Sequence, residues 1–184
     1  MTREDSSELW HATLRPDKSS LLHDYFCGGA FMEGRDRYRY GRPSNYIIET
    51  GLHLRNDQND TPLHYAAQFG FLSDIPIELL TKENFSVTNN NGWTPMHDAA
   101  QSGGFEHIPS ELITEELLTV KDKDGGSPLY FAKVNNRLDE LLGVEFSAAV
   151  IDEVGEEWYA RNQQVIQERK MLEATNKVAA LELF

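Results

Sequence analysis

The chain is poor in cysteine and has no long apolar run. Cys27 is the only cysteine among 184 residues, which excludes an intramolecular disulfide and suits a reducing compartment. No apolar run reaches the roughly 18 residues that a transmembrane helix needs, and the acidic start of the chain does not resemble a signal peptide. The sequence therefore predicts a cytoplasmic protein that does not associate with a membrane.

Basic side chains are also scarce. The chain has 17 Lys and Arg against 30 Asp and Glu, for a formal net charge of -13. Such a charge repels nucleic-acid backbones and attracts basic proteins at long range. The excess is concentrated in residues 56–143, which carry 5 basic and 14 acidic side chains. We therefore expect a protein partner with a basic surface and no direct binding of nucleic acid.

Catalytic constellations are missing from the sequence as well. No nucleophile with its base, no metal-ligand cluster and no phosphate-binding loop occurs at a spacing typical of enzymes. The nearest candidate is Cys27 with His23 one helical turn before it, and this pair lacks a third orienting group. We predict no enzyme activity, no cofactor and no metal. The alternative is an enzyme or small-ligand binder built on residues 1–55.

A repeat organises the middle of the chain. The motifs TPLH, TPMH and SPLY begin at Thr61, Thr94 and Ser127, 33 residues apart each time. Threonine or serine followed by proline is typical of a helix start, since the hydroxyl caps the helix and proline needs no amide partner. The register continues through alanine pairs, a glycine and an Ile-Pro pair, at Ala66, Ala67, Gly70, Ile75 and Pro76 and again at Ala99, Ala100, Gly103, Ile108 and Pro109.

A 33-residue period with a TPLHxA core resembles the ankyrin repeat, in which a turn is followed by two antiparallel helices. The resemblance implies an all-α ankyrin-repeat solenoid, with repeats in residues 56–143. It also implies a second helix over residues 73–80 and 106–113, and structural roles for His64 and His97, which tie adjacent units together. The IPxELLT form of the second half is similar to bacterial or phage ankyrin sequences.

Both ends of the chain depart from the repeat. Residues 1–55 read as an N-terminal cap with a degenerate leading repeat, with helices expected near residues 7–14 and 19–26. Residues 144–184 form a helical extension. Within it, residues 149–182 lack proline and repeat an apolar residue every seven positions, which predicts a long helix with a narrow apolar seam. The seam consists of Ile151, Trp158, Val165, Leu172 and Ala179. We expect this helix to pack over the last repeat of a monomer, with homodimerisation through it as the alternative.

The segment RDRYRYGR at residues 35–42 is the one basic and aromatic cluster. Its arginines are expected to pair with the acidic repeats or with carboxylates of a partner. Binding of phosphate or stacking on RNA bases is the alternative, and the role of this cluster stays open.

The resemblance implies that a partner binds the concave face, through the hairpin fingers and the variable positions of the first helices. Trp93 and Phe69 are expected to be aromatic anchors, unless each packs locally against a neighbouring finger. Asp98 stands where the sister repeats carry aromatic residues. We predict an adaptor or inhibitor, which in its sharper form blocks a nucleic-acid-handling protein. The expected partner-binding residues are Asp57, Gln58, Asp60, Gln68, Phe69, Asn90, Asn91, Trp93, Asp98, Gln101, Ser102, Lys123 and Asp124.

Overall fold

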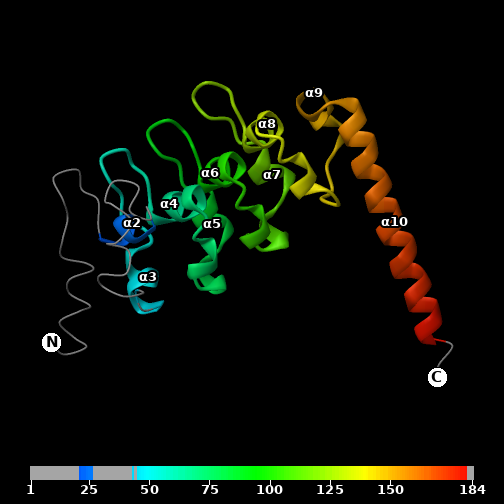
Figure 1. The fold of residues 1–184 in the computed structure, drawn as a ribbon, viewed down its shortest axis with the longest axis horizontal. Helices are drawn as coiled ribbons and strands as arrows, with labels where there is room; N and C mark the ends of the chain where they lie inside the picture. The colour runs from blue at the N-terminus through cyan, green and yellow to red at the C-terminus, as the bar shows by residue number, and fades with distance from the viewer. Residues whose placement is uncertain (1–20, 27–42, 44, 182–184) are drawn as a thin grey trace.

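The computed structural model describes residues 21–26, 43 and 45–181, and this part of the chain is helical without strands. The helices stack side by side in an arch, and the last helix leaves the stack (Figure 1). The predicted all-α solenoid is therefore confirmed. Its α-helices are α2 (Leu21–Phe26), α3 (Asn45–Gly51), α4 (Pro62–Phe69), α5 (Lys82–Phe85), α6 (Pro95–Ser102), α7 (Glu115–Leu118), α8 (Pro128–Val134), α9 (Ile151–Val154) and α10 (Glu156–Leu181).

The first helix of each repeat begins and ends as the sequence predicts. Thr61 and Thr94 are the N-caps of α4 and α6, and a proline follows each of them. Ser127 caps α8 by accepting a hydrogen bond from the Tyr130 amide. Gly70 and Gly103 end α4 and α6 with φ of 76° and 87°, a left-handed conformation that costs glycine little.

The second half of each repeat differs from the expected helix. Residues 73–80 and 106–113 form pairs of 3-10 turns, and a short α-helix follows each pair. The prediction of one continuous helix there is wrong because Pro76 does not lie inside a helical turn. It has φ of −53° and ψ of 134°, and Ile75 before it is extended. Proline disfavours the helical conformation of the residue that precedes it, so it separates the two turns. The turns are Leu72–Asp74, Ile77–Leu79, Phe105–His107 and Ser110–Leu112.

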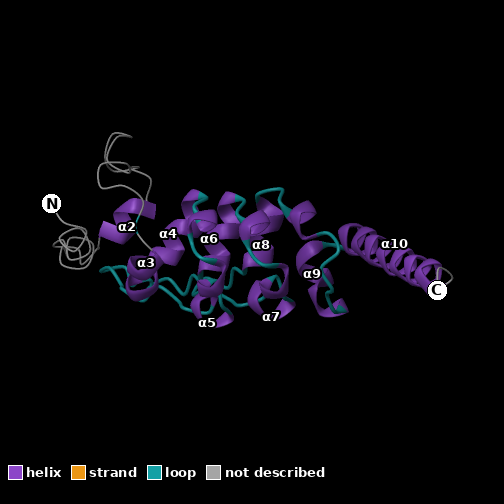
Figure 2. Ribbon diagram, turned by 90° about the horizontal axis from the view of Figure 1, so that it is seen from below, coloured by secondary structure: helices purple, strands orange, loops and turns teal. Residues whose placement is uncertain are grey.

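The core lies where the first helices stack on one another. Ala66, Ala67, Ala99 and Ala100 are fully buried, because small side chains let neighbouring helices approach closely. Large side chains from the second halves fill the space beneath them, among them Leu72, Phe85, Phe105 and Leu118. Seen from below, α4, α6 and α8 form one row and α5 and α7 the opposite row (Figure 2).

The N-terminal side of the stack is covered by α2 and α3. Leu22, Tyr25 and Phe26 of α2 are buried, and the Tyr25 hydroxyl donates to Asp74 Oδ2 at 3.2 Å. Ile48 of α3 is fully buried in the same core. The expected helix over residues 7–14, Cys27 and the basic cluster at residues 35–42 lie outside the described residues.

The C-terminal side is closed by α9 and the first turns of α10. Trp158, Asn162 and Ile166 of α10 are buried, and Asn162 accepts from the Gly143 amide at 2.7 Å and donates to the Val144 carbonyl at 2.9 Å. Gly155, with φ of 97°, separates α10 from α9, so the expected helix over residues 149–182 is interrupted.

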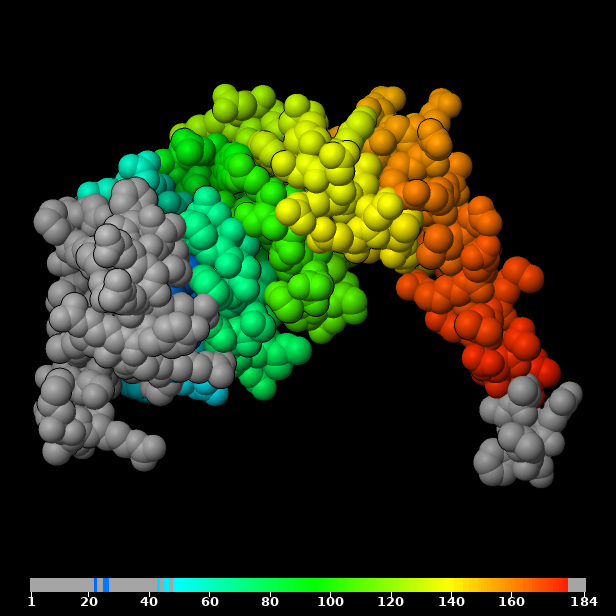
Figure 3. All heavy atoms as spheres, in the orientation of Figure 1, coloured from blue at the N-terminus to red at the C-terminus, as the bar shows by residue number. Residues whose placement is uncertain are grey.

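Beyond Ile166 the last helix projects from the molecule (Figure 3). Residues 167–178 are all exposed, including Leu172 of the expected seam, and Ile151 belongs to α9 instead. Packing over the last repeat therefore holds only for the first turns of α10. No helix in the described ranges combines the length and apolar character needed to span a bilayer.

Candidate functional site

Three turns precede the first helices and form the fingers of the array, at residues 56–60, 89–93 and 122–126. Each finger is built on an Asn or Asp side chain at its first position, 33 residues apart in the sequence. In the third finger Asp122 Oδ1 accepts from the amides of Asp124 and Gly126, at 2.9 and 2.8 Å. Asn56 and Asn89 hold the other two fingers in the same way. The fingers are therefore preorganised by their own side chains.

Backbone hydrogen bonds join each finger to the next. The Asn90 amide donates to the Gln58 carbonyl at 2.9 Å, and the Lys123 amide donates to the Asn91 carbonyl at 3.0 Å. In Figure 1 the fingers are the loops that rise at the top of the arch. These bonds make one connected surface from three segments that are distant in sequence.

A side-chain hydrogen bond accompanies each backbone bond, and its polarity differs between the two junctions. Asn89 Nδ2 donates to Asp60 Oδ1 at 2.8 Å, so the later finger supplies the donor. At the next junction Trp93 Nε1 donates to Asp122 Oδ2 at 2.9 Å, so the later finger supplies the acceptor. At each junction one finger therefore supplies a hydrogen-bond donor and the other supplies the acceptor.

His64 ties adjacent repeats together, as the resemblance implied, whereas among the described residues His97 Nδ1 bonds only to Thr94 of its own repeat. His64 Nδ1 accepts from the Thr61 amide at 3.1 Å, and its Nε2 lies 3.1 Å from the carbonyl of Trp93 in the next repeat. His97 is fully buried. Burial disfavours its imidazolium form and lowers the pKa of His97 to about 4, against the opposing effects of the Gly126 backbone and the Asp122 carboxylate. In the described part of the chain no group of three His, Cys, Asp or Glu is placed to hold a metal.

Most of the predicted partner-binding residues lie along the fingers and at the ends of α4 and α6. Asp60 and Trp93 are half-buried, and Asp98 is buried. Phe69 is 36% exposed and packs beside Tyr65, with ring centroids 6.1 Å apart. The exposed residues are Asp57, Gln58, Gln68, Asn90, Asn91, Gln101, Ser102, Lys123 and Asp124.

Trp93 has a larger structural role than the sequence suggested. Its indole ring lies against Phe131, with ring centroids 4.8 Å apart, and against His97 at 5.8 Å. The contact with Phe131 and the bond to Asp122 join the second repeat to the third. Part of the ring stays exposed, so Trp93 both supports the third finger and lines the surface beside it.

Asp98 is the least expected residue of this surface. Its side chain is only 5% exposed, and its Oδ2 atom has no hydrogen-bond partner within the described residues. Burial, and to a lesser degree the charge of Asp60, raises the pKa of Asp98 well above its ordinary value. The sister repeats carry Tyr65 and Phe131 at this position, so the fold itself does not need a carboxylate here.

The acidic side chains of residues 56–143 are unevenly distributed. Only five belong to the fingers and first helices, namely Asp57, Asp60, Asp98, Asp122 and Asp124. The other nine lie on the second halves, in the row that contains α5 and α7, and in the segment that follows α8. The second halves and the segment after α8 therefore carry more acidic side chains than the fingers and first helices together.

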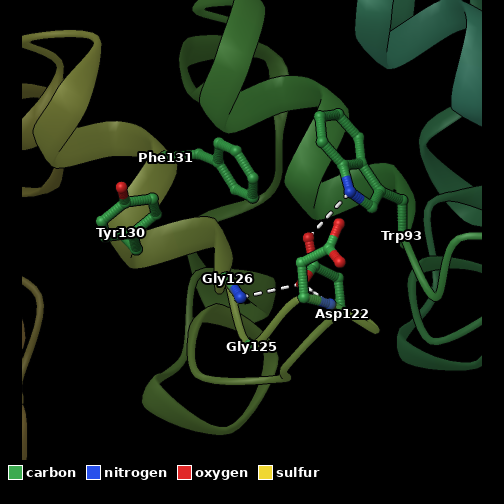
Figure 4. Close-up of a pocket in the computed structure, with 7 residues that line it drawn as sticks. Trp93, Asp122, Gly125, Gly126, Tyr130 and Phe131 are labelled. Carbon is green, nitrogen blue, oxygen red and sulfur yellow. Dashed lines mark hydrogen bonds between the residues drawn. The ribbon is translucent and has the colours of Figure 1, made fainter.

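A pocket beside the third finger was not predicted from the sequence. It has a volume of about 570 Å³ and is lined by Trp93, Asp122, Asp124, Gly125, Gly126, Tyr130 and Phe131 (Figure 4). Of these residues only Trp93 and Asp124 were expected to bind a partner. The spacing of Asn56, Asn89 and Asp122 was the available signal for Asp122, because these residues share one position in the repeat.

Comparison with known families identifies the repeat. The family model for ankyrin repeats (3 copies) matches residues 44–117, from the start of α3 into α7. A comparison with curated proteins found no match. The TPLH-type caps, the stacked first helices and the linked fingers agree with the family match, and α8 extends the same arrangement beyond the matched residues. Residues 44–117 therefore form ankyrin repeats, and ankyrin repeats indicate a protein–protein interaction module.

Proposed function

We propose that the chain is an adaptor or inhibitor that binds a basic protein through its fingers and the ends of α4 and α6. The observation that carries this proposal is the row of exposed polar side chains on a rigid frame. Gln58, Asn91 and Lys123 sit on fingers that backbone bonds hold together, and their side chains make no hydrogen bond in the described part of the chain. Preorganised surfaces lose little conformational entropy on binding.

Charge supports a basic partner in two ways. Asp57 and Asp124 are exposed on the fingers, where they would meet a partner directly. The acidic side chains of the opposite row add to the long-range field that steers a basic protein toward the array. A basic groove that normally holds nucleic acid has matching chemistry, so blocking such a protein is the sharper form of this proposal.

Affinity capture from the native host, followed by reconstitution with the purified partner, tests the proposal. The informative variant is Asp57→Asn with Asp124→Asn, which neutralises the two exposed finger acids. The matched control is Glu78→Gln with Glu111→Gln, which removes the same charge from exposed positions in the opposite row. Association rates are measured at several salt concentrations.

The finger variant should associate about tenfold more slowly than wild type at low salt, within the range known for electrostatic steering. The association rate of the control variant should fall less, because Glu78 and Glu111 lie farther from the proposed interface. A partner that binds the finger variant as fast as wild type, and the control more slowly, would place the interface in the opposite row and overturn the proposal.

Self-association through α10 is the second candidate, favoured by a specific observation. Met171, Leu172 and Val178 are 70%, 62% and 57% exposed on the projecting part of the helix. Exposed apolar side chains at helical spacing are typical of helix pairing. Sedimentation of the chain with Met171→Glu and Leu172→Glu, beside wild type, measures the effect. If the wild-type and variant chains both sediment as monomers, self-association through α10 is excluded.

A further inference from the structure

We propose that the pocket beside the third finger receives an arginine side chain of the protein partner. This inference rests on the proposed function and names the group that the partner supplies. It depends on three features of the pocket: a connected aromatic surface, an opening at Gly126, and two carboxylates at its edge.

The aromatic surface is made by rings from two repeats. Trp93 and Phe131 have centroids 4.8 Å apart at 54°, and Tyr130 meets Phe131 edge to face at 5.6 Å and 75°. Figure 4 shows Phe131 between the other two rings. Tyr130 is 45% exposed, although its counterparts His64 and His97 are buried. Its ring is therefore available to a ligand.

The opening exists because Gly126 has no side chain. The corresponding residues in the other fingers are Asp60 and Trp93, which reach toward the following finger. A Cβ at Gly126 would lie 2.8 Å from Phe131 Cε2 and 3.1 Å from Asp122 Oδ2. Glycine thus lets the Phe131 ring and the Asp122 carboxylate both border the same space.

The charge at this space is negative. Asp122 is largely buried, and its Oδ2 accepts one hydrogen bond from Trp93, so this carboxylate oxygen retains capacity for a second donor. Asp124 is exposed at the rim. The nearby Lys121 is paired with Glu153 at 2.9 Å, so its charge is compensated. An anionic or purely apolar ligand would leave these carboxylates unmatched.

A guanidinium group matches both parts of the pocket at once. It is planar and stacks on aromatic faces, while its in-plane N–H groups donate to carboxylates. A lysine ammonium lacks the flat face, and a neutral side chain lacks the charge. The volume of about 570 Å³ also leaves room for the backbone that flanks the arginine.

The test is a titration of the isotope-labelled full chain, followed by NMR. The probe is acetyl-Gly-Arg-Gly-amide, and its control is the same peptide with citrulline, which keeps the shape but is neutral. The Trp93 indole N–H and the Gly126 amide should shift with the arginine peptide and saturate with a dissociation constant on the order of a millimolar, as expected for one side chain. The citrulline peptide should leave both signals in place.

Two variants examine the aromatic contribution. Tyr130→Leu should weaken binding of the arginine peptide by about 2- to 5-fold, because it removes the aromatic face, whereas Tyr130→Phe should bind like wild type. Tyr46→Leu, the same change at an exposed tyrosine of α3 outside the pocket, should change nothing. Equal shifts with arginine and citrulline, or a Tyr130→Leu chain that binds as tightly as wild type, would overturn the inference.

The outcome separates the inference from the proposed function. If the arginine peptide does not bind the pocket but the finger variant still associates more slowly with the partner, the arginine inference is wrong and the proposed finger interface stands. If the pocket binds the arginine peptide but the finger variant associates with the partner as fast as wild type, the arginine site stands and the proposed finger interface is wrong.

Discussion

The indole N–H of Trp93 donates to the carboxylate of Asp122 across one repeat, at 2.9 Å. The same carboxylate holds its own finger through two backbone amides. Asp122 therefore acts only as an acceptor, both within its own finger and toward Trp93, whereas Asn89 in the preceding finger acts as acceptor within its turn and as donor toward Asp60.

Asp122→Asn should destabilise the array by roughly 1–3 kcal/mol, the cost of leaving the partly buried Trp93 donor without an acceptor. The new amide must keep its oxygen toward the finger, so its N–H₂ group meets the Trp93 N–H. Urea unfolding measures the change. In the Trp93→Phe background, where no indole donor remains, the same substitution should cost clearly less. Equal costs in the two backgrounds would contradict the assigned bond.

Asn89→Asp should destabilise the first junction, because it sets a carboxylate against the Asp60 carboxylate. Adding Asp60→Asn restores the hydrogen bond in the opposite direction, with the new amide at position 60 as donor and the new carboxylate at position 89 as acceptor. The double variant should therefore be more stable than Asn89→Asp alone, by about 1 kcal/mol. Purely additive losses in a thermal-unfolding cycle would show that the two residues are not coupled.

Asp98→Asn should stabilise the protein at pH 8, by roughly 1–3 kcal/mol, because it replaces a buried carboxylate whose Oδ2 has no hydrogen-bond partner among the described residues. Burial raises the pKa of Asp98, so the folded state retains this proton more strongly than the unfolded state does. Ionisation of Asp98 therefore lowers the free energy of unfolding once the pH rises above the ordinary pKa of 3.8, and this loss grows as the pH rises further.

The advantage of Asp98→Asn should consequently shrink as the pH falls toward 4. Urea unfolding of both chains at pH 8 and pH 4.5 measures it. An advantage of the same size at both pH values would mean that ionisation of Asp98 is not the cause. If the carboxylate serves recognition, the more stable variant should also bind the partner less tightly.

His97 should remain neutral at pH 5 in the folded protein. Burial lowers the pKa of His97 from 6.5 to about 4, so the unfolded chain takes up this proton first. The stability that neutral His97 contributes is complete above pH 6.5 and is lost as the pH falls toward 4, at up to about 1.4 kcal/mol per pH unit. An NMR titration of the His97 ring protons checks this, and a midpoint near 6.5 would refute it.

Ala99→Leu should cost roughly 1–3 kcal/mol, because Ala99 is fully buried between stacked first helices and has no room for a longer side chain. Ala160→Leu is the matched control, since Ala160 is exposed on α10 and should tolerate the same change. Thermal unfolding of the two variants compares them. Similar melting temperatures would argue against the close stacking of the helices.

Much of the repeat could be predicted because its signals are local. Thr-Pro sets a helix start, and Gly70 and Gly103 adopt the left-handed conformation that ends the helix, whatever their surroundings. The second halves were misjudged because their apolar spacing resembles a helix, while Pro76 and Pro109 impose extended backbone that the pattern of apolar residues does not reveal.

The site was harder to predict because its contacts cross from one repeat to another. Trp93 was visible as an aromatic residue that the repeat does not require, but its acceptor Asp122 lies 29 residues away. Only the structure shows that adjacent fingers meet side by side. The pocket depends on Gly126, and the sequence shows this glycine but not that Phe131 and Asp122 border the space beside it.

The matched polarity of the finger contacts also restricts how this array can grow. Repeat proteins commonly lengthen when a unit is duplicated within the gene. If the second repeat were copied next to itself, the indole N–H of Trp93 would face the amide of a second Asn89, donor against donor, in place of Asp122. A new unit would need a compensating substitution before it could be accommodated. The hydrogen bonds between adjacent fingers thus constrain the order and number of repeats in this chain, and one repeat cannot simply replace another.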